Sequence, residues 1–323
     1  MTATPTPARA VTDRVPDAPP GNWVDRLAPG AAKPYLRLAR FDRPIGAWLL
    51  LFPAWWGQAL AEVSLGRPYP NPWYLVLFLV GAFVMRGAGC TYNDIVDRDF
   101  DARVARTAAR PIPSGQVSVI QAFAFLAALC LIGLLVLLQF NLFTIVLGAA
   151  SLALIAAYPF AKRFTFWPQL VLGLTFKWGA LVGWAAVTGS LAFAALLLYA
   201  GSVLWTIGYD TIYAHQDKED DALIGLKSTA LKFGAATPRW VAACYAGAVL
   251  LWGAAGLLAG AHAAFPLALI LAAAHFAWQV ATLDTSDAGN CLARFKSNQV
   301  IGWLLCAGLV ADMGLSALLF FDL

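Results

Sequence analysis

Half of the acidic residues of this chain fall in two short clusters, each placed where a long apolar segment ends. Nine of the eighteen Asp and Glu residues lie between 94 and 101 or between 210 and 221. In the first cluster, Asn93, Asp97 and Asp101 follow one another at every fourth position. Side chains at this spacing project from one face of an α-helix. A row of oxygen ligands on a helix is typical of a site for a hard divalent cation such as Mg²⁺.

The second cluster has a similar pattern. Asp210, Asp217 and Asp221 are separated by seven and then four positions, which predicts that they also share one helix face. Each cluster continues into a polar loop with basic residues, including Arg110 in the first and Lys227 in the second. Carboxylates that hold Mg²⁺, next to cations that contact phosphate oxygens, indicate a diphosphate site. An ordinary charged loop explains any one of these residues, but not two clusters with helical spacing.

Four further residues are candidates for contacts with an anionic substrate: Arg86, Tyr158, Lys162 and Arg163. Arg86 precedes Asn93 by seven residues, which places it two helical turns away on the same face. An arginine within an apolar segment needs an anionic substrate or an internal partner. Tyr158 and Lys162 are four positions apart at the end of another apolar segment. For Lys162 and Arg163, the alternative is that they extend toward lipid head groups.

The elements that must position these residues are predicted to be membrane-spanning helices. The chain is 60% hydrophobic and 12% charged, with a mean hydropathy of +0.69, which is far from the composition of soluble domains. Apolar segments of about 20 residues, the length that spans a bilayer, recur along it. We therefore predict an all-α, polytopic membrane protein with nine transmembrane helices, near 44–64, 72–92, 118–139, 142–160, 168–188, 191–213, 238–259, 264–283 and 298–320.

The distribution of positive charge predicts how these helices are oriented. With nine spans, 20 of the 22 Lys and Arg residues lie on one side of the membrane, when Arg86 in the span near 72–92 is counted with that side. That side is cytoplasmic, or faces the matrix in an organelle, by the positive-inside rule. Both acidic clusters and the N-terminus lie on it, and the C-terminus lies on the other side. Lys177 is the one basic residue placed inside a predicted span without a role in this interpretation.

The remaining regions contribute less. Residues 1–30 contain six prolines and no apolar run, so we expect a disordered tail, followed by a single domain over 31–323 with an amphipathic helix near 31–42. Asp13 and Asp17 argue against a mitochondrial presequence. The expected location is therefore a bacterial inner membrane with a cytoplasmic N-terminus, and a mitochondrial inner membrane is the weaker alternative. Cysteines and histidines show no metal-ligand spacing, and no nucleic-acid partner is expected.

The segments that carry the candidate chemistry resemble those of a known family. Residues 86–101 with 106–115 are similar to the first aspartate-rich motif of the UbiA-type intramembrane aromatic prenyltransferases, and residues 209–221 with 225–229 to the second. Shorter matches lie at 40–46, 158–163 and 298–302, and the resemblance covers about residues 35–320. Within the family, the residues of these motifs are most similar to those of the branch that prenylates 4-hydroxybenzoate in ubiquinone biosynthesis.

The resemblance implies nine helices around a central cavity and a Mg²⁺-dependent enzyme in the lipid bilayer. The enzyme would transfer a polyprenyl group from polyprenyl diphosphate to the ring of 4-hydroxybenzoate. It implies that Arg86 holds the carboxylate of the acceptor and that Tyr158 and Lys162 contact the diphosphate. The implied ligands of Mg²⁺-diphosphate, with Asp210 supporting them, are Asn93, Asp97, Asp101, Asp217 and Asp221. Two alternatives stay open, namely another aromatic or porphyrin acceptor, and a cation-coupled transporter.

Overall fold

The computed structural model describes residues 18–103, 107–223 and 225–321, which form helices and connecting turns without any strand. Short helices α1 (Trp23–Leu27) and α2 (Lys33–Leu38) come first. Short helices also link α9 to α12, namely η1 (His215–Asp217), α10 (Lys218–Leu223), α11 (Thr229–Phe233) and η2 (Gly234–Ala236). The main helices are α3 (Ile45–Ser64), α4 (Pro72–Asp101), α5 (Val119–Leu137), α6 (Leu142–Phe164), α7 (Pro168–Phe176), α8 (Gly179–Thr188), α9 (Phe193–Ala214), α12 (Thr237–Ala259), α13 (Phe265–Ala281) and α14 (Ala288–Phe321).

Every predicted apolar segment is helical in the structure, one of them as two helices, so the all-α membrane fold is confirmed. In the described part of the chain, seven helical spans are long and apolar enough to cross a membrane, with α7 and α8 counted together. Helix α3 is not one of the seven, and α13 has only 17 residues. The count of nine therefore stays a prediction. Two helices extend past their apolar parts, α4 to Asp101 and α14 back to Ala288.

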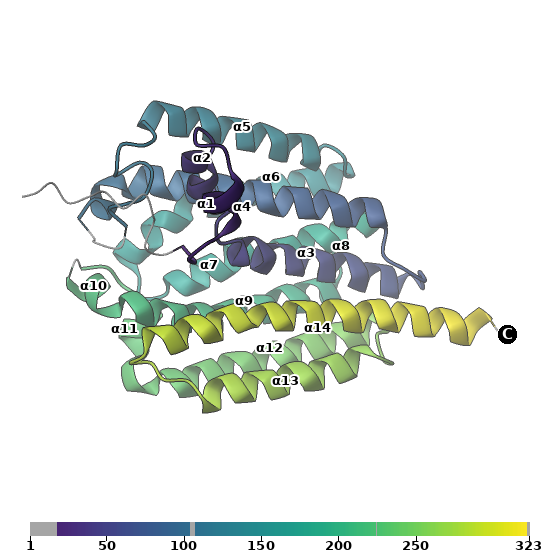
Figure 1. Cartoon of the computed structure of the whole chain (residues 1–323). Helices are drawn as coiled ribbons and strands as arrows, with labels where there is room; N and C mark the ends of the chain where they lie inside the picture. Colours follow the sequence, from purple (N-terminus) through teal and green to yellow (C-terminus); the bar gives the residue numbers. More distant parts are fainter. Residues whose placement is uncertain (1–17, 104–106, 224, 322–323) are drawn as a thin grey trace, which may run out of the picture.

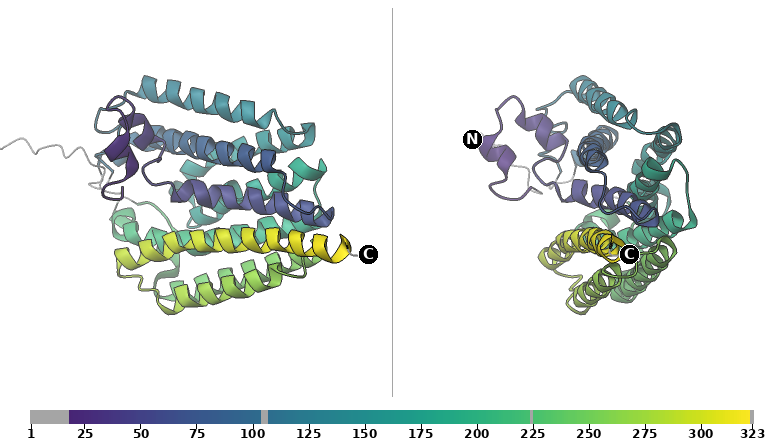
Figure 2. Two further views of the ribbon diagram at one scale, coloured as in Figure 1. Left: turned by 45° about the vertical axis from the view of Figure 1, so that its right-hand side comes forward. Right: turned by 90° about the vertical axis from the view of Figure 1, so that its right-hand side faces the viewer.

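The main helices run side by side and end at two opposite ends of the bundle (Figures 1 and 2). At one end lie α1, α2, α10 and α11, together with the chain that follows α4 and α9 (Figure 1). The C-terminal end of α14 lies at the other end (Figure 1). Both acidic clusters are therefore at the same end of the molecule, and the C-terminal end of α14 is opposite, as the distribution of basic residues predicted.

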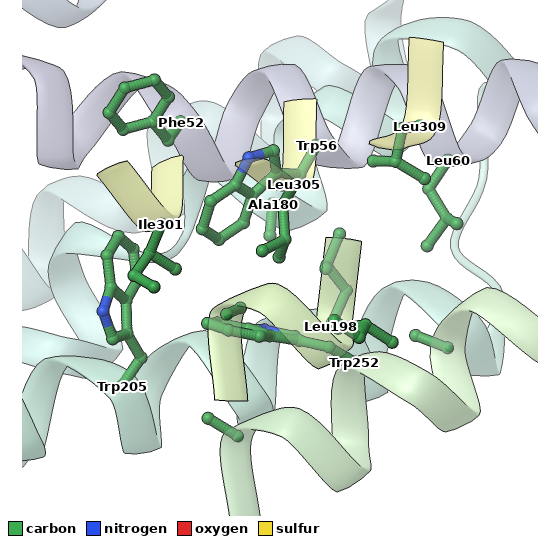
Figure 3. Packing of buried hydrophobic residues seen from close by; sticks show 14 of the residues in the cluster. Phe52, Trp56, Leu60, Ala180, Leu198, Trp205, Trp252, Ile301, Leu305 and Leu309 are labelled. Carbon is green, nitrogen blue, oxygen red and sulfur yellow. The ribbon is translucent and has the colours of Figure 1, made fainter. Parts of the chain in front are cut away.

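The core between α3, α9, α12 and α14 is rich in aromatic rings (Figure 3). Trp56, Trp205 and Trp252 are fully buried, and their ring centroids lie 5.2, 5.3 and 5.8 Å apart. Each indole N–H has an acceptor, for example the Oδ1 of Asn298 at 2.7 Å from the Nε1 of Trp205. Buried indoles need such acceptors because an unpaired N–H in an apolar core is costly. This core fixes α9, one wall of the site described below.

Helices α3 and α8 cross at a contact that only glycine permits. A Cβ on Gly57 of α3 would overlap the carbonyl of Ala180, and a Cβ on Gly183 of α8 would overlap the carbonyl of Ala54. Small residues let two helix backbones approach closely, which is the usual way in which membrane helices gain packing energy. The segment 168–188 was predicted as one helix, but it is broken between α7 and α8 at Lys177 and Trp178.

The N-terminal helices cover one end of the bundle. Residues 1–17 of the predicted tail lie outside the described residues, whereas α1 lies within its second part, so residues 18–30 are not uniformly without structure. The Nη2 of Arg37 binds the Oδ1 of Asp25 at 2.9 Å, and the Nε1 of Trp23 donates to the carbonyl of Phe41 at 2.8 Å. The amphipathic helix expected near 31–42 corresponds to α2, whose Leu38 is fully buried.

Candidate active site

A cavity of about 750 Å³ lies among α3 to α9. Its walls are mostly apolar, and along α4 they extend from Leu77 to Asp94, a distance of about 25 Å at 1.5 Å per residue. Charged and polar lining residues, among them Asn93, Asp94 and Asp210, come from the helix ends near the acidic clusters. The cavity thus combines a long apolar part with one charged end.

Asp97 is the centre of a cluster of paired charges next to the charged end of the cavity, one helical turn beyond the lining residue Asn93. It is buried, with a side-chain exposure of 1%, and three groups donate hydrogen bonds to it. The Nζ of Lys162 lies 2.7 Å from its Oδ2 and the Nη2 of Arg163 lies 3.1 Å from its Oδ1. The Nδ2 of Asn93 donates to the same Oδ2 at 3.2 Å. The first acidic row therefore stands next to the two basic residues of α6.

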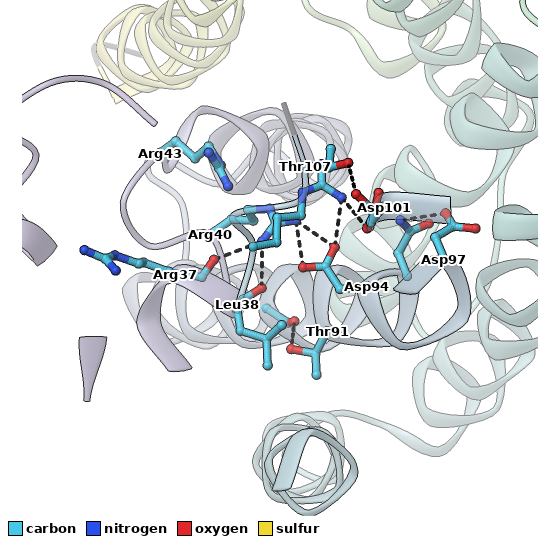
Figure 4. Close-up of polar contacts among 12 residues, drawn as sticks. Arg37, Leu38, Arg40, Arg43, Thr91, Asp94, Asp97, Asp101 and Thr107 are labelled. Carbon is cyan, nitrogen blue, oxygen red and sulfur yellow. Dashed lines mark hydrogen bonds and ion pairs between the residues drawn. The ribbon is translucent and has the colours of Figure 1, made fainter. Parts of the chain in front are cut away.

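Asp94 and Asp101 flank this group and share one arginine. The Nη1 of Arg110 lies 2.9 Å from the Oδ2 of Asp101 and 3.3 Å from the Oδ1 of Asp94. The Nη2 of Arg40 also donates to both oxygens of Asp94, at 2.7 and 2.9 Å (Figure 4). The hydroxyl of Thr107 donates to the carbonyl of Asp101 at 2.9 Å, which ties the loop after α4 to the end of the helix.

Asp94 and Arg40 are residues of this site that the spacing argument missed. Asp94 lies one position away from the row formed by Asn93 and Asp97, so helical periodicity placed it on another face. Arg40 is 54 residues away in the sequence. The only available signal was the short match at 40–46, which contains this arginine.

The second acidic cluster is arranged differently from the prediction. Asp210 lines the cavity from α9, but α9 ends at Ala214 and η1 separates it from α10. Asp210 and Asp217 therefore do not share one regular α-helix. A ring nitrogen of His215 lies 3.0 Å from the hydroxyl of Thr237 at this break. The side chain of Asp221 lies outside the described residues, and among the described side chains no group of three or more His, Cys, Asp or Glu converges.

The first acidic row nevertheless suits a hard cation by the chemistry of its donors. Asn93, Asp97 and Asp101 offer only oxygen ligands besides the amide nitrogen of Asn93, and oxygen is what Mg²⁺ prefers. The carboxylates of Asp97 and Asp101 now accept hydrogen bonds from Lys162, Arg163 and Arg110. The basic side chains of Lys162, Arg163 and Arg110 also suit a phosphate group. This end therefore offers both metal ligands and phosphate-binding groups to a charged substrate.

Arg86 projects into the cavity from the middle of α4. Its Nε is buried and has no hydrogen-bond partner among the described residues. The guanidinium lies over the ring of Phe176, 5.0 Å from its centroid, and packs against Gly46 of α3. It also interacts electrostatically with Asp210. A buried guanidinium with an unused N–H in a cavity is a suitable contact for a carboxylate.

Helix α6 brings the other candidates to the same end. Tyr158 lines the cavity, one turn before Lys162. Arg163 binds Asp97 and lies over the rings of Phe100 and Phe160, at 5.0 and 5.3 Å, so its alternative role as a lipid-facing residue is not what the structure shows. The backbone N–H of Lys227 donates to the carbonyl of Lys162 at 2.9 Å. This bond joins the second polar loop to α6.

Comparisons with known proteins agree with this arrangement. The model of the UbiA prenyltransferase family matches residues 50–307. A relative named 4-hydroxybenzoate polyprenyltransferase, mitochondrial, from Rattus norvegicus is 50% identical over 89% of this chain and 76% of its own length. The proteins of that name from Caenorhabditis elegans and Arabidopsis thaliana are 47% and 45% identical, over 88% and 90% of this chain and 80% and 71% of their own lengths.

Solved structures share the fold. The apo structure of a UbiA homolog from Aeropyrum pernix K1 has a TM-score of 0.69 and 29% identity, and the match covers 82% of this chain and 98% of that one. A UbiA homolog from Archaeoglobus fulgidus bound to GPP and Mg²⁺ has a TM-score of 0.65 at 20% identity, with coverage of 87% and 99%. At that identity the second similarity establishes the fold alone.

The comparisons correct the expected location. The similar relatives are mitochondrial enzymes of animals and a plant, which favours a mitochondrial inner membrane and makes the expectation of a bacterial inner membrane wrong. Acidic residues near the N-terminus were too weak a signal to decide between the two. The multi-pass membrane character of the chain is unaffected. Because the family model covers most of the chain and the relatives align over nearly all of its helices, the chain belongs to the UbiA prenyltransferase family.

Proposed function

We propose that this protein transfers a polyprenyl group from polyprenyl diphosphate to the ring of 4-hydroxybenzoate, with Mg²⁺ as cofactor. The observation that carries the proposal is the cavity itself, in which Arg86 lies between mostly apolar walls and an end that Asn93, Asp94 and Arg110 line. Such a cavity suits a substrate pair made of a lipid diphosphate and an aromatic acid. Relatives that are 45–50% identical carry the corresponding name, which supports the same substrates.

The charged end is proposed to bind the diphosphate. Residues that would hold Mg²⁺ there are Asn93, Asp97, Asp101, Asp217 and Asp221, and Asp210 would support them from the cavity wall. When bound, Mg²⁺ supplies positive charge that neutralises a diphosphate leaving group. Lys162 and Arg163, which bind Asp97 in the described structure, would contact phosphate oxygens as well, together with Tyr158, which lines the cavity one helical turn before Lys162.

Arg86 is proposed to bind the carboxylate of 4-hydroxybenzoate. Its buried N–H groups can donate two parallel hydrogen bonds to a planar carboxylate. This contact would orient the ring, because the carboxylate is held at one end and the phenol lies at the opposite end of the molecule. Holding two reactants in one orientation removes much of the entropic cost of their encounter.

The reaction then needs stabilised charge and the exclusion of water. The allylic C–O bond of the donor breaks, and its electron pair leaves with the diphosphate, whose negative charge the basic residues stabilise. The ring carbon ortho to the phenol attacks the allylic carbon, forms the new C–C bond and then loses its proton. The apolar walls keep water away from the allylic cation, which water would otherwise capture. No covalent bond to the protein is required.

An assay with the purified membrane protein tests the proposal. Labelled 4-hydroxybenzoate and a polyprenyl diphosphate should give a labelled prenylated acid only when Mg²⁺ is present. Prenylation of a different aromatic or of a porphyrin, with none of 4-hydroxybenzoate, would assign another acceptor. Uptake of a solute by proteoliposomes, with no prenylated product from any acceptor, would instead favour a transporter.

A further inference from the structure

Lys177 is a lysine buried inside the membrane-embedded part of the chain. It has no solvent exposure and follows α7 directly, where the span over 168–188 is interrupted. Lysine within a membrane span is costly and requires a specific partner. It is not among the residues that line the cavity, and the chemistry proposed above gives it no role. The contacts of Lys177 therefore have to explain why a lysine is buried at this position.

The first contact is with a carbonyl that a proline leaves without a donor. Helix α3 continues through Pro53, which has no N–H, so the carbonyl of Leu49 lacks the donor that residue 53 would normally provide. The Nζ of Lys177 donates to this carbonyl at 2.7 Å. The side chain of Lys177 thus supplies the hydrogen bond that Pro53 removes from α3. In a membrane span, each backbone group left unsatisfied would cost several kcal/mol.

The other contacts connect Lys177 to α9. Its Nζ lies 4.3 Å from the ring centroid of Trp205 and 5.2 Å from that of Tyr209. It also interacts electrostatically with Asp210. Trp205 is itself fixed by the hydrogen bond to Asn298 and by the aromatic core shown in Figure 3. The Nζ of one lysine therefore joins α3, the break between α7 and α8, and α9.

These three elements form the part of the cavity around Arg86. Gly46 and Leu49 line the cavity from the segment of α3 that precedes Pro53. A Cβ on Gly46 would lie only 2.7 Å from the Nε of Arg86, so the position of α3 sets the space left for this guanidinium. On the opposite side, Asp210 lines the cavity and interacts with Arg86. A shift of α3 against α9 would therefore move the surroundings of Arg86 more than the charged end at Asp97.

We propose that Lys177 is a positioning residue for the aromatic acceptor. By bonding the free carbonyl of Leu49 and contacting Trp205 and Tyr209, it fixes α3 against α9 and so fixes the space in which Arg86 binds a carboxylate. The inference rests on the proposed function for the identity of the acceptor. The link between Lys177 and Pro53 does not, because it is a property of the fold.

A double-mutant cycle between Lys177 and Pro53 tests the inference. Lys177→Met keeps the apolar length of the side chain and removes the donor, so we expect the KM for 4-hydroxybenzoate to rise at least fivefold more than the KM for polyprenyl diphosphate. In Pro53→Ala, the new N–H of residue 53 can bond the carbonyl of Leu49. Lys177→Met made in that background should therefore change the ratio of the two KM values less than twofold. The matched control is Lys232→Met, which removes an ammonium that lies 4.7 Å from the ring of Trp167, away from the cavity lining.

The stability of the four proteins of the cycle, namely the wild type, Lys177→Met, Pro53→Ala and the double variant, gives a readout that needs no substrate. In detergent, Lys177→Met should lower the midpoint of thermal unfolding, and it should lower it less in the Pro53→Ala background than in the original chain. Lys177→Met alone could yield no folded protein. In that case, folded protein from the double variant with Pro53→Ala would support the inference, and its absence would overturn the inference. Equal increases in both KM values, or additive effects of the two changes, would also overturn it. A wild-type chain that does not prenylate 4-hydroxybenzoate would refute the proposed function while leaving the unfolding cycle interpretable.

Discussion

Arg40 is held in a left-handed backbone conformation by its contact with Asp94. Its φ is +61°, a value that residues other than glycine rarely adopt and that costs about 1–3 kcal/mol. One nitrogen of its guanidinium bonds both oxygens of the Asp94 carboxylate, at 2.7 and 2.9 Å. Both side chains are largely buried, with exposures of 10% and 1%. The contact fixes the turn between α2 and α3 to the acidic end of α4, and so joins two walls of the cavity.

We expect Asp94→Asn to destabilise the protein by about 3 kcal/mol, because it leaves two buried arginines, Arg40 and Arg110, without a charge that both now contact. Thermal unfolding in detergent measures the loss. Asp99→Asn is the matched control on the same helix, since Asp99 is 74% exposed and lies 3.6 Å from an exposed Arg98. A surface pair of this kind contributes at most about 1 kcal/mol. Similar unfolding midpoints for both variants would contradict a structural role of Asp94.

Much of this site was predictable because its residues follow simple periodicities. The spacing of Asn93, Asp97 and Asp101 identified one face of α4, and Lys162 was identified from its place at the end of an apolar segment. The sequence predicted that these residues belong to one diphosphate site, but it did not predict that Lys162 binds Asp97 itself. Spacing within one helix gives the direction of a side chain, but it carries no information about which residue of another helix faces it. The pairing of Asp94 with Arg40 was missed for that reason.

The second acidic cluster and the broken span show another limit. Asp210 and Asp217 were assigned to one helix because seven residues make two turns, yet α9 ends between them. Nothing in the local sequence marks that end, and the contact between His215 and Thr237 that accompanies it comes from a distant segment. Likewise, the span over 168–188 is apolar throughout except for Lys177, whose partner on α3 is 128 residues away. Hydropathy measures the length of such a segment, not its continuity.

Replacing any one of Asp97, Asp101, Asp217 or Asp221 with Ala is expected to lower turnover by roughly 100-fold or more, if they hold Mg²⁺ and the diphosphate. Prenyl transfer by equal amounts of purified, folded protein measures the effect. EDTA should abolish the activity of the wild-type enzyme, and added Mg²⁺ should restore it. Asp99→Ala serves as the control, because its side chain is mostly exposed. Near-normal turnover in two or more of the four variants would refute the assignment of the ligands.

The topology can be tested with reporters fused at three points, two of them after truncation of the chain and the third at the end of the full chain. Fusions after Gly115 and after Gly234 should report the same side of the membrane, and a fusion after Leu323 the opposite side. The two polar loops lie at one end of the bundle and the C-terminal end of α14 lies at the other (Figure 1). The basic residues near the loops predict that this is the inner side of the membrane, which in a mitochondrion faces the matrix. Finding the two loops on opposite sides would rule out a site built from both acidic clusters.

Gly46 offers a test of how closely α3 restrains Arg86. A methyl group at residue 46 would lie 2.7 Å from the Nε and 2.9 Å from the Nη2 of Arg86, so Gly46→Ala must displace the guanidinium. We expect the KM for 4-hydroxybenzoate to rise about tenfold, the effect of losing about 1.4 kcal/mol of binding, with little change for the diphosphate. Gly314→Ala is the control, because a Cβ there meets no atom within 4 Å. An unchanged KM for the acid in Gly46→Ala would mean that Arg86 does not contact it.

Arg86 itself is the most direct test of acceptor recognition. Its Nε is buried without a hydrogen-bond partner in the described part of the chain, and the guanidinium lies at the wall formed by Gly46 and Phe176. Arg86→Lys keeps the positive charge but cannot form two parallel hydrogen bonds to a carboxylate. We therefore expect it to raise the KM for 4-hydroxybenzoate about 10- to 100-fold, the loss of a charged hydrogen bond of about 1.5–3 kcal/mol, and to affect the KM for polyprenyl diphosphate much less.

Arg86→Ala should nearly abolish activity, since it also removes one of the two basic residues, Arg86 and Lys177, that interact electrostatically with Asp210. The alternative is that Arg86 only balances the charge of Asp210 and keeps the wall of the cavity in order. In that case, both substrates would depend on it equally, and Arg86→Lys would restore most of the activity lost in Arg86→Ala. A further comparison uses an acceptor that lacks the carboxylate. If Arg86 binds the carboxylate of 4-hydroxybenzoate, wild type and Arg86→Lys should have similar KM values for this acceptor. Equal increases in KM for donor and acceptor in Arg86→Lys would contradict carboxylate recognition by this residue.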